Sequence, residues 1–460
     1  MAIRIDTVQR FADELGKNPV VRVAKGALNK VYMDDVVIDP DVKVQRDFKF
    51  HLSPYKLPMT NQMRSGRCWI FTYTNMLKRK LMKRYNLPQT FLLSQKYIMF
   101  YDHLEKCNAL LEVMYYMVHE RGFPVHSLEF SSLRSGYLED GGTWAFFTKL
   151  VHKYGIVPYE FYPDNRQSTF STDFKDILEH QCYTQGTAIA AAKTRAEFER
   201  IKKECLQVCY NVLESFLGKP PTSFTWTYLD AKDRYHEVKK PFTPLSFVKK
   251  VITPVVNLDK FVVLINDPRN PYYRIYSVEL LHNVVPDKFR DLAKVPTMVY
   301  FNVPLDIIKQ AAYKSIRANI GVPFSADKTH NMFTDQSIFD TQNSWYKELL
   351  GVSFMRPRKF LFDNLTASPN HAMLFIGTNG PKGDWQVENS WGERNKDFPY
   401  LTMTDGWFDH YIGDVVVHES FLPKDIRGRY HKALKDPSKY VFYPFWDVFG
   451  SVAKHHGGQS

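Results

Sequence analysis

The segment TNQMRSGRCWIFTYTN, residues 60–75, places Gln62 six positions before Cys68 and a tryptophan directly after it. Apolar and aromatic side chains then recur at helical spacing, at Trp69, Tyr73, Met76, Leu77 and Leu81. The pattern stops near NLPQ, residues 86–89, so we expect a helix that begins at Cys68. A helix N-terminus favours a thiolate, but the segment alone fits a buried core cysteine better than a nucleophile.

Length and composition indicate a globular chain of more than one minimal domain. The 460 residues are 44% hydrophobic and 24% charged, which excludes disorder as the main state. The net charge of +12 admits anionic partners such as nucleic acid. Lysine and arginine are dispersed, however, which favours solubility as their role, and the run LKRKLMKR, residues 77–84, is expected to form a solvated helix face. With no secretory signal or membrane span in the sequence, we expect a cytoplasmic protein with no membrane partner.

The chain contains 5 cysteines in 460 residues, at positions 68, 107, 182, 205 and 209. The number is odd and no spacing recurs. Cys205 and Cys209 lack the sequence partners of a typical zinc site. These features predict free thiols in a reducing compartment, and structural roles for the cysteines other than Cys68.

A cysteine nucleophile needs an imidazole base, a group that orients the imidazole, and donors for the oxyanion. NHAML places His371 at the start of an apolar strand, and ENSWG places Asn389 and Trp391 on a second strand, 18 residues after the histidine. Adjacent strands would bring Asn389 to the far nitrogen of His371, with Trp391 shielding that bond from water. The side-chain amide of Gln62 and the backbone N–H of Cys68 could bind the oxyanion.

The blocks NQMRSGRCW, NHAML and ENSWGE, in this order, resemble those that carry the glutamine, cysteine, histidine and asparagine of papain-like cysteine peptidases. DGGTWAF is similar to the loop whose backbone pairs with substrate in that family. His371 follows Cys68 by 303 positions, which exceeds the usual spacing of about 130–150. This enlarged layout resembles the bleomycin hydrolase branch, as do PPTSFTWTYLD and VLINDPRNPYY, and the resemblance runs from about residue 50 to the tail.

The resemblance implies an α+β, papain-like two-lobe fold, with a helical lobe, a β-rich lobe, a large and mostly helical insertion and an N-terminal extension. The extension is expected at 1–59 and the helical lobe at 60–164. An oligomerisation insertion is expected at 165–302, the β-rich lobe at 303–445, and a tail in the active-site cleft at 446–460.

The resemblance also assigns catalytic roles to four residues of this chain. Cys68 is the expected nucleophile, His371 the general base and acid, Asn389 the orienting amide and Gln62 the oxyanion donor. It implies hydrolysis of N-terminal residues from peptides or aminoacyl amides through a thioester, with no metal or organic cofactor.

The expected substrate contacts are Gly141, Gly142 and Trp391. The glycine pair also fits a plain turn, and Trp391 also fits a core position. Relatives of this branch are homohexamers whose active sites face an interior channel, and some bind nucleic acid through a basic channel. The resemblance therefore implies a homohexamer here, and it keeps nucleic acid among the candidate partners.

The tail departs from the family pattern. In that branch the terminal carboxylate holds the free amine of the substrate. Here FWDVFGSVAKHHGGQS matches the family as far as Ala453 and then adds KHHGGQS, which would displace the carboxylate. We therefore expect autocatalytic trimming near Ala453. Two other readings stay open, namely a nucleic-acid-binding oligomer with secondary catalysis and a Cys–His amide hydrolase that acts on a non-peptide substrate.

Overall fold

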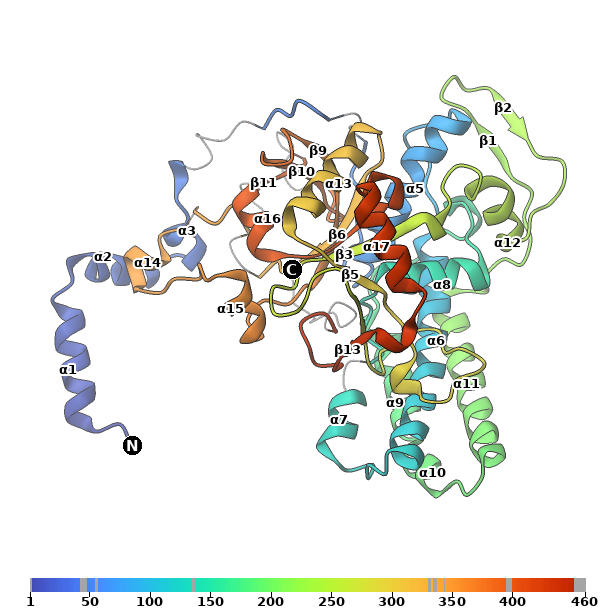
Figure 1. The fold of residues 1–460 in the computed structure, drawn as a ribbon, viewed down its shortest axis with the longest axis horizontal. Coiled ribbons are helices and arrows are strands. Elements are labelled where there is room, and N and C mark those ends of the chain that lie inside the picture. The colour runs from blue at the N-terminus through green and yellow to red at the C-terminus, as the bar shows by residue number, and fades with distance from the viewer. Residues whose placement is uncertain are drawn as a thin grey trace.

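The computed structural model describes residues 2–41, 48–53, 57–134, 137–329, 332–333, 337–342, 344–393 and 399–450. It combines helices with one large sheet, so the predicted α+β class is confirmed (Figure 1). The tail residues beyond 450, including the expected trimming site, lie outside the described residues. Within the described ranges, no helix is both long enough and apolar enough to cross a membrane.

Helices make up most of the first half of the described chain. They are α1 (Ile5–Gly16), α2 (Pro19–Leu28), α3 (Met33–Val37), α5 (Cys68–Tyr85), α6 (Gln95–Tyr115), α7 (Leu128–Arg134), α8 (Trp144–Tyr154), α9 (Thr172–Tyr183), α10 (Gly186–Ala191), α11 (Arg195–Leu217) and α12 (Pro244–Phe247). Further along are α13 (Leu305–Arg317), α14 (Tyr346–Leu350), α15 (Arg358–Asp363), α16 (Asp405–Tyr411) and α17 (Lys424–Leu434). In Figure 1, α1 and α2 extend away from the body of the molecule.

The strands of the described residues form a large sheet and a separate pair, β1 (Thr227–Leu229) with β2 (Tyr235–Glu237). The order across the large sheet is β13-β4-β5-β3-β12-β6-β9-β10-β11-β8-β7. Its strands are β3 (Phe261–Ile265), β4 (Ile275–Val278), β5 (Tyr300–Asn302), β6 (Val322–Ala326), β7 (Met332–Phe333), β8 (Ile338–Phe339), β9 (His371–Thr378), β10 (Trp385–Glu388), β11 (Leu401–Met403), β12 (Ile412–His418) and β13 (Val441–Tyr443).

Helix α5 begins at Cys68, which confirms the sequence prediction. It ends where Asn86 adopts a left-handed conformation (φ 53°), with its N–H bonded to the Met82 carbonyl. The positive charges of Lys83 and Arg84 in the last turn interact favourably with the negative end of the helix dipole. The helix packs against α6, α8 and β9, and its apolar side chains are buried in that core.

Strand β9 is buried at all eight positions, which explains why it reads as an apolar run rather than an alternating one. It pairs antiparallel with β6 on one side and β10 on the other, and helices α5 and α13 pack against it. Its first residue is His371, and β10 ends one residue before Asn389. The sheet therefore brings these two positions to one end of a strand pair.

Residues 165–302 differ from the mostly helical block that the sequence predicts. The first half contains α9, α10 and α11, but the second half adds β3, β4 and β5 to the large sheet. The strand FVVLI is buried throughout, and a short apolar run of this kind cannot be told from a buried helix by periodicity. The boundaries of the insertion as a domain stay a prediction.

Candidate active site

Cys68 lies at the N-terminus of α5, and only 4% of its surface is exposed. Burial raises the pKa of its thiol, whereas the backbone N–H of Ala372, the charge of Lys328 and the backbone N–H of Trp69 lower it. Ala372 directly follows His371 on β9. The thiol therefore lies against the start of the strand that carries the histidine.

His371 and Asn389 form a buried hydrogen bond, with Nε2 and Oδ1 2.8 Å apart. An amide oxygen only accepts, so Nε2 donates. The same Oδ1 accepts from the backbone N–H of Ser390 at 2.7 Å, which fixes the orientation of the amide. With the proton on Nε2, Nδ1 is the basic nitrogen of the neutral ring.

Trp391 covers the imidazole of His371. The two ring centroids are 4.7 Å apart and the planes are inclined by 26°. The ammonium of Lys328 lies 4.9 Å from the centroid of the Trp391 ring. An aromatic side chain in this position excludes water from the histidine–asparagine bond, and a polar bond is stronger in such a low-dielectric environment.

Gln62 lies in the loop that leads into α5, next to the segment that follows β10. Its backbone N–H donates to the Ser390 carbonyl at 2.8 Å. Its side-chain Oε1 accepts from the Ser390 hydroxyl at 2.6 Å, and its Nε2 donates to the Ser65 carbonyl at 2.6 Å. Because an amide nitrogen carries two hydrogens, the Ser65 bond uses only one of them.

Helix α5 is also fastened to the end of β10, next to Asn389. Asn75 Nδ2 donates to Glu388 Oε1 at 2.8 Å, and Arg79 forms a buried ion pair with the same carboxylate. The prediction that 77–84 is a solvated face is therefore wrong for Lys78 and Arg79, which are 3% and 6% exposed. The ion pair compensates the cost of burying the Arg79 charge and connects the cysteine helix to the asparagine strand.

Gly141 and Gly142 line a small cavity together with Cys68 and His371. Its volume is about 10 Å³, close to the space that one water molecule needs. The remaining lining residues are Tyr73, Ser325, Asn370 and Ala372. A Cβ atom at position 142 would lie 2.5 Å from the Trp69 ring, so this position requires glycine for packing whatever its role in substrate binding.

Comparison with known proteins identifies the family. The profile of the Peptidase C1-like family matches residues 2–450. The chain belongs to this family. The C1-like chain is 30% identical to the bleomycin hydrolase of Gallus gallus over 416 residues, covering 86% of each chain. It is 29% identical to aminopeptidase C of Lactobacillus delbrueckii subsp. lactis over 460 residues, covering 98% of each.

A solved structure matches the C1-like chain along nearly its whole length. The crystal structure of PepW from Lactobacillus rhamnosis HN001 superimposes with a TM-score of 0.89 at 28% identity, covering 98% of this chain and 99% of that one. The papain-like fold and the family resemblance that the sequence motifs predict are confirmed. The chain is a cysteine-type peptidase.

The sequence analysis did not predict the role of Asp140, a buried carboxylate that contacts the loop before Cys68. Asp140 accepts from the backbone N–H of Gly66 at 2.8 Å and from the Ser171 hydroxyl, and its Oδ1 lies 3.1 Å from His103 Nε2. Burial alone would raise the pKa of Asp140, but the hydrogen bond and charge of His103, with further help from Lys175 and Ser171, hold it well below its usual range. No sequence signal connects these distant positions.

A buried lysine supports the glycine loop in a similar way. Lys106 Nζ donates to the backbone carbonyls of Glu139 and Gly141, each at 2.7 Å, and pairs with Asp102 at 2.6 Å. An ammonium group has three donor hydrogens, and these three acceptors satisfy them. The loop that lines the cavity is thus held by a side chain of α6.

Proposed function

We propose that the chain is an aminopeptidase that removes N-terminal residues from peptides and aminoacyl amides, with Cys68 as its nucleophile. The observation that carries the proposal is one small cavity that both Cys68 and His371 line. Nε2 of this histidine forms a hydrogen bond with Asn389 Oδ1 at 2.8 Å. The names of the relatives, aminopeptidase C and bleomycin hydrolase, support the same substrate class.

Acylation begins when Nδ1 of His371 takes the proton of the Cys68 thiol. The resulting thiolate attacks the carbonyl carbon of the scissile amide, and the carbonyl oxygen becomes an oxyanion. The backbone N–H of Cys68 and the side-chain amide of Gln62 bind that oxyanion. The imidazolium of His371 then gives its proton to the departing nitrogen, the C–N bond breaks, and a thioester with Cys68 remains.

Deacylation uses the same groups in reverse. His371 takes a proton from water, and the hydroxide that forms attacks the thioester carbon. The C–S bond breaks, the acid product leaves, and the proton returns to the sulfur of Cys68. Asn389 keeps the imidazole oriented through both steps, because it holds Nε2 and so reserves Nδ1 for the proton transfers.

Recognition of a free substrate amine is the part of the proposal that defines an aminopeptidase. The resemblance attributes it to the terminal carboxylate of the chain, and our separate hypothesis is that trimming near Ala453 places this carboxylate in the cleft. An enzyme with such an anion in its cleft would bind a cationic amine and reject a blocked one, because a blocked amine cannot pair with the buried charge.

A panel of fluorogenic aminoacyl amides with free and N-acylated termini tests the proposal. We expect the free amides to have a kcat/KM at least about 100-fold higher than the blocked ones, and Cys68→Ala to lose measurable turnover. Epoxide thiol inhibitors should label the wild-type protein at Cys68. Equal turnover of blocked and free substrates would contradict the aminopeptidase assignment. Activity that survives in Cys68→Ala would contradict the nucleophile.

A further inference from the structure

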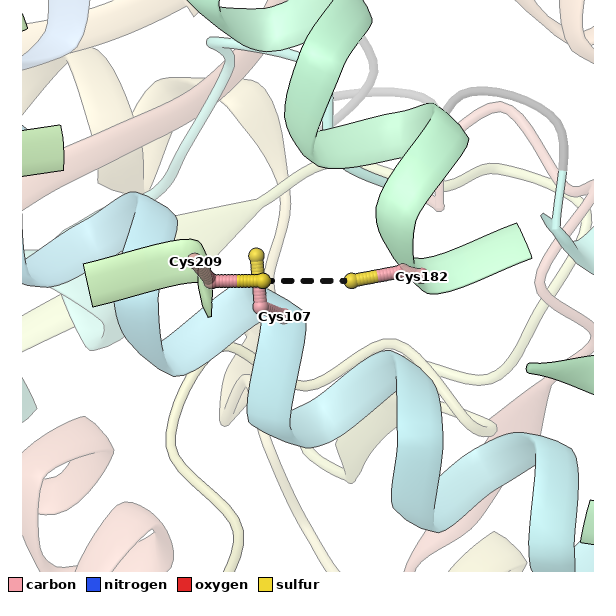
Figure 2. Close-up of side chains that lie close together, drawn as sticks. All are labelled: Cys107, Cys182 and Cys209. Atoms are coloured by element: carbon pink, nitrogen blue, oxygen red, sulfur yellow. Dashed lines mark hydrogen bonds between the residues drawn. The ribbon is translucent and has the colours of Figure 1, made fainter. Parts of the chain in front are cut away.

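Four of the five cysteines converge in the helical region, away from the cavity that Cys68 lines. Cys107 is on α6, Cys182 on α9, and Cys205 and Cys209 on α11. The sulfur atoms of Cys107, Cys182 and Cys209 all lie within 4.8 Å of one another (Figure 2). These three side chains come from three different helices and point toward one another.

The spacing of the sulfurs matches a metal site. The sulfur atoms of Cys182 and Cys209 are 3.8 Å apart. Tetrahedral Zn²⁺ binds thiolates at about 2.3 Å, and this geometry places neighbouring sulfurs about 3.8 Å from each other. A disulfide would need a separation of about 2.05 Å instead. The pair is thus already at the distance of two zinc ligands, without a covalent bond between them.

Cys205 lies outside the group of three sulfurs that are within 4.8 Å of one another, and it is the candidate for a fourth ligand. It precedes Cys209 by one turn of α11, so both side chains lie on one face of that helix. Its Sγ lies 3.8 Å from the carbonyl oxygen of Gln181, the residue next to Cys182. Cys205 is 2% exposed, and Cys107, Cys182 and Cys209 are fully buried.

We propose that Cys107, Cys182, Cys209 and Cys205 bind one Zn²⁺ ion. Thiolates are soft ligands that favour such an ion, and four protein ligands with no position open to substrate define a structural zinc site. Each thiol loses its proton when it binds the metal, and the two positive charges of zinc reduce the four thiolate charges to a net charge of −2. The inference departs from the family expectation of a metal-free chain.

Zinc at this position would connect α6, α9 and α11 at a single point. Helix α6 also carries Lys106, which holds the backbone of the glycine loop through Gly141. Since Lys106 directly precedes Cys107, a metal bound at Cys107 would fix the helix that supports the active-site loop. The metal thus acts on stability and on the positioning of that loop, and not on the bond-breaking steps.

Metal analysis of the full chain purified from zinc-supplemented cells without chelators tests the site. We expect about one zinc ion per chain. We also expect Cys68→Ser to keep this ion, and Cys182→Ser and Cys209→Ser to lose it. Cys205→Ser should bind zinc more weakly, because it lacks the fourth thiolate. Replacement of zinc by Co²⁺ should produce the intense visible bands of a tetrahedral thiolate site, and again Cys68→Ser is the matched control.

A second measurement uses only the wild-type chain and so does not depend on whether the variants fold. Mass spectrometry after native alkylation should find the four cluster cysteines protected with zinc and modified after chelation, and the chelated protein should have a lower Tm. Absence of both bound zinc and a cobalt thiolate spectrum would overturn the site. A native disulfide between Cys182 and Cys209 would also overturn it, and Cu⁺ bound in place of zinc would overturn the zinc assignment.

Discussion

At the scale of single residues, Asp414 is a buried carboxyl group that contacts a residue lining the cavity. It lies on β12, is 3% exposed and accepts a hydrogen bond from the Ser325 hydroxyl, and Ser325 lines the cavity beside Cys68. Burial raises the pKa of Asp414 to about 6, although the hydrogen bonds from Ser325 and from its own backbone N–H oppose this change.

The raised pKa of Asp414 makes the stability of the fold depend on pH. Because the folded state prefers the neutral carboxyl, this contribution is complete below the unfolded pKa of about 3.9 and is lost as the pH rises through about 6. We expect Asp414→Asn to raise the free energy of unfolding at pH 7.5 by up to about 3 kcal/mol, and much less at pH 4.

Urea unfolding at the two pH values measures the effect of Asp414→Asn. Asp425→Asn, an exposed change on α17, is the matched control and should alter stability by less than about 1 kcal/mol at either pH. A gain that is the same at pH 4 and pH 7.5 would show that the charge of Asp414 is not its cause.

At the scale of secondary-structure elements, Asp140 fastens three parts of the chain to one another. Through Gly66 it holds the loop before α5, through His103 it holds α6, and through Ser171 it holds the start of α9. The loop before α5 sets the position of Cys68. We therefore predict that this carboxylate positions Cys68, the proposed nucleophile, through the backbone and takes no direct part in catalysis.

Replacement of Asp140 by Asn should destabilise the protein, because it removes the charge that pairs with buried His103. We expect a loss of about 3 kcal/mol at pH 7. Since the pKa of Asp140 is depressed, its contribution is complete above the unfolded pKa of about 3.9 and is lost as the pH falls below that value. The loss in Asp140→Asn should therefore shrink in acid.

Unfolding measured from pH 7 down to pH 3 tests Asp140→Asn, with the exposed α9 change Asp173→Asn as the control. The rate at which an epoxide inhibitor labels Cys68 provides a second readout, and we expect it to fall in Asp140→Asn alone. A variant as stable as wild type with an unchanged labelling rate would refute the positioning role.

At the scale of the whole molecule, the N-terminal helix α1 does not pack into the hydrophobic core. None of its residues is buried, and it exposes four large apolar side chains, at Ile5, Val8, Phe11 and Leu15. Figure 1 shows α1 and α2 projecting from the body. An amphipathic helix with an exposed apolar face is expected to bury that face in contact with another protein surface.

We propose that this face packs against other copies of the chain in the expected homohexamer. Light scattering coupled to size exclusion should give about six times 53.9 kDa for the wild-type chain. The double change Val8→Glu and Phe11→Glu should yield smaller species, whereas Gln9→Glu, also exposed on α1, should not. A monomeric wild-type chain would refute the assembly, and an intact hexamer in the double variant would refute the role of α1.

The sequence determined the local structure, the family and the residue types of the candidate site. The helical period after Cys68 predicted α5, the apolar run after His371 predicted β9, and the order of the motifs indicated the family. These signals are readable because each depends on residues close together in the chain. Aromatic and apolar periodicity specifies the element, and the motif specifies which chemical group stands at its end.

Only the tertiary structure decided which distant groups meet. Glu388 with Arg79, Asp140 with His103, and the cysteines of α6, α9 and α11 are each paired by the packing of elements far apart in the chain. The register of neighbouring elements, and not the spacing along the sequence, sets such distances. For the same reason the sequence did not reveal that Arg79, in the basic run of α5, is buried and paired with a carboxylate. Nor did it reveal that the sulfurs of Cys107, Cys182 and Cys209, which have no recurring spacing, lie within 4.8 Å of one another.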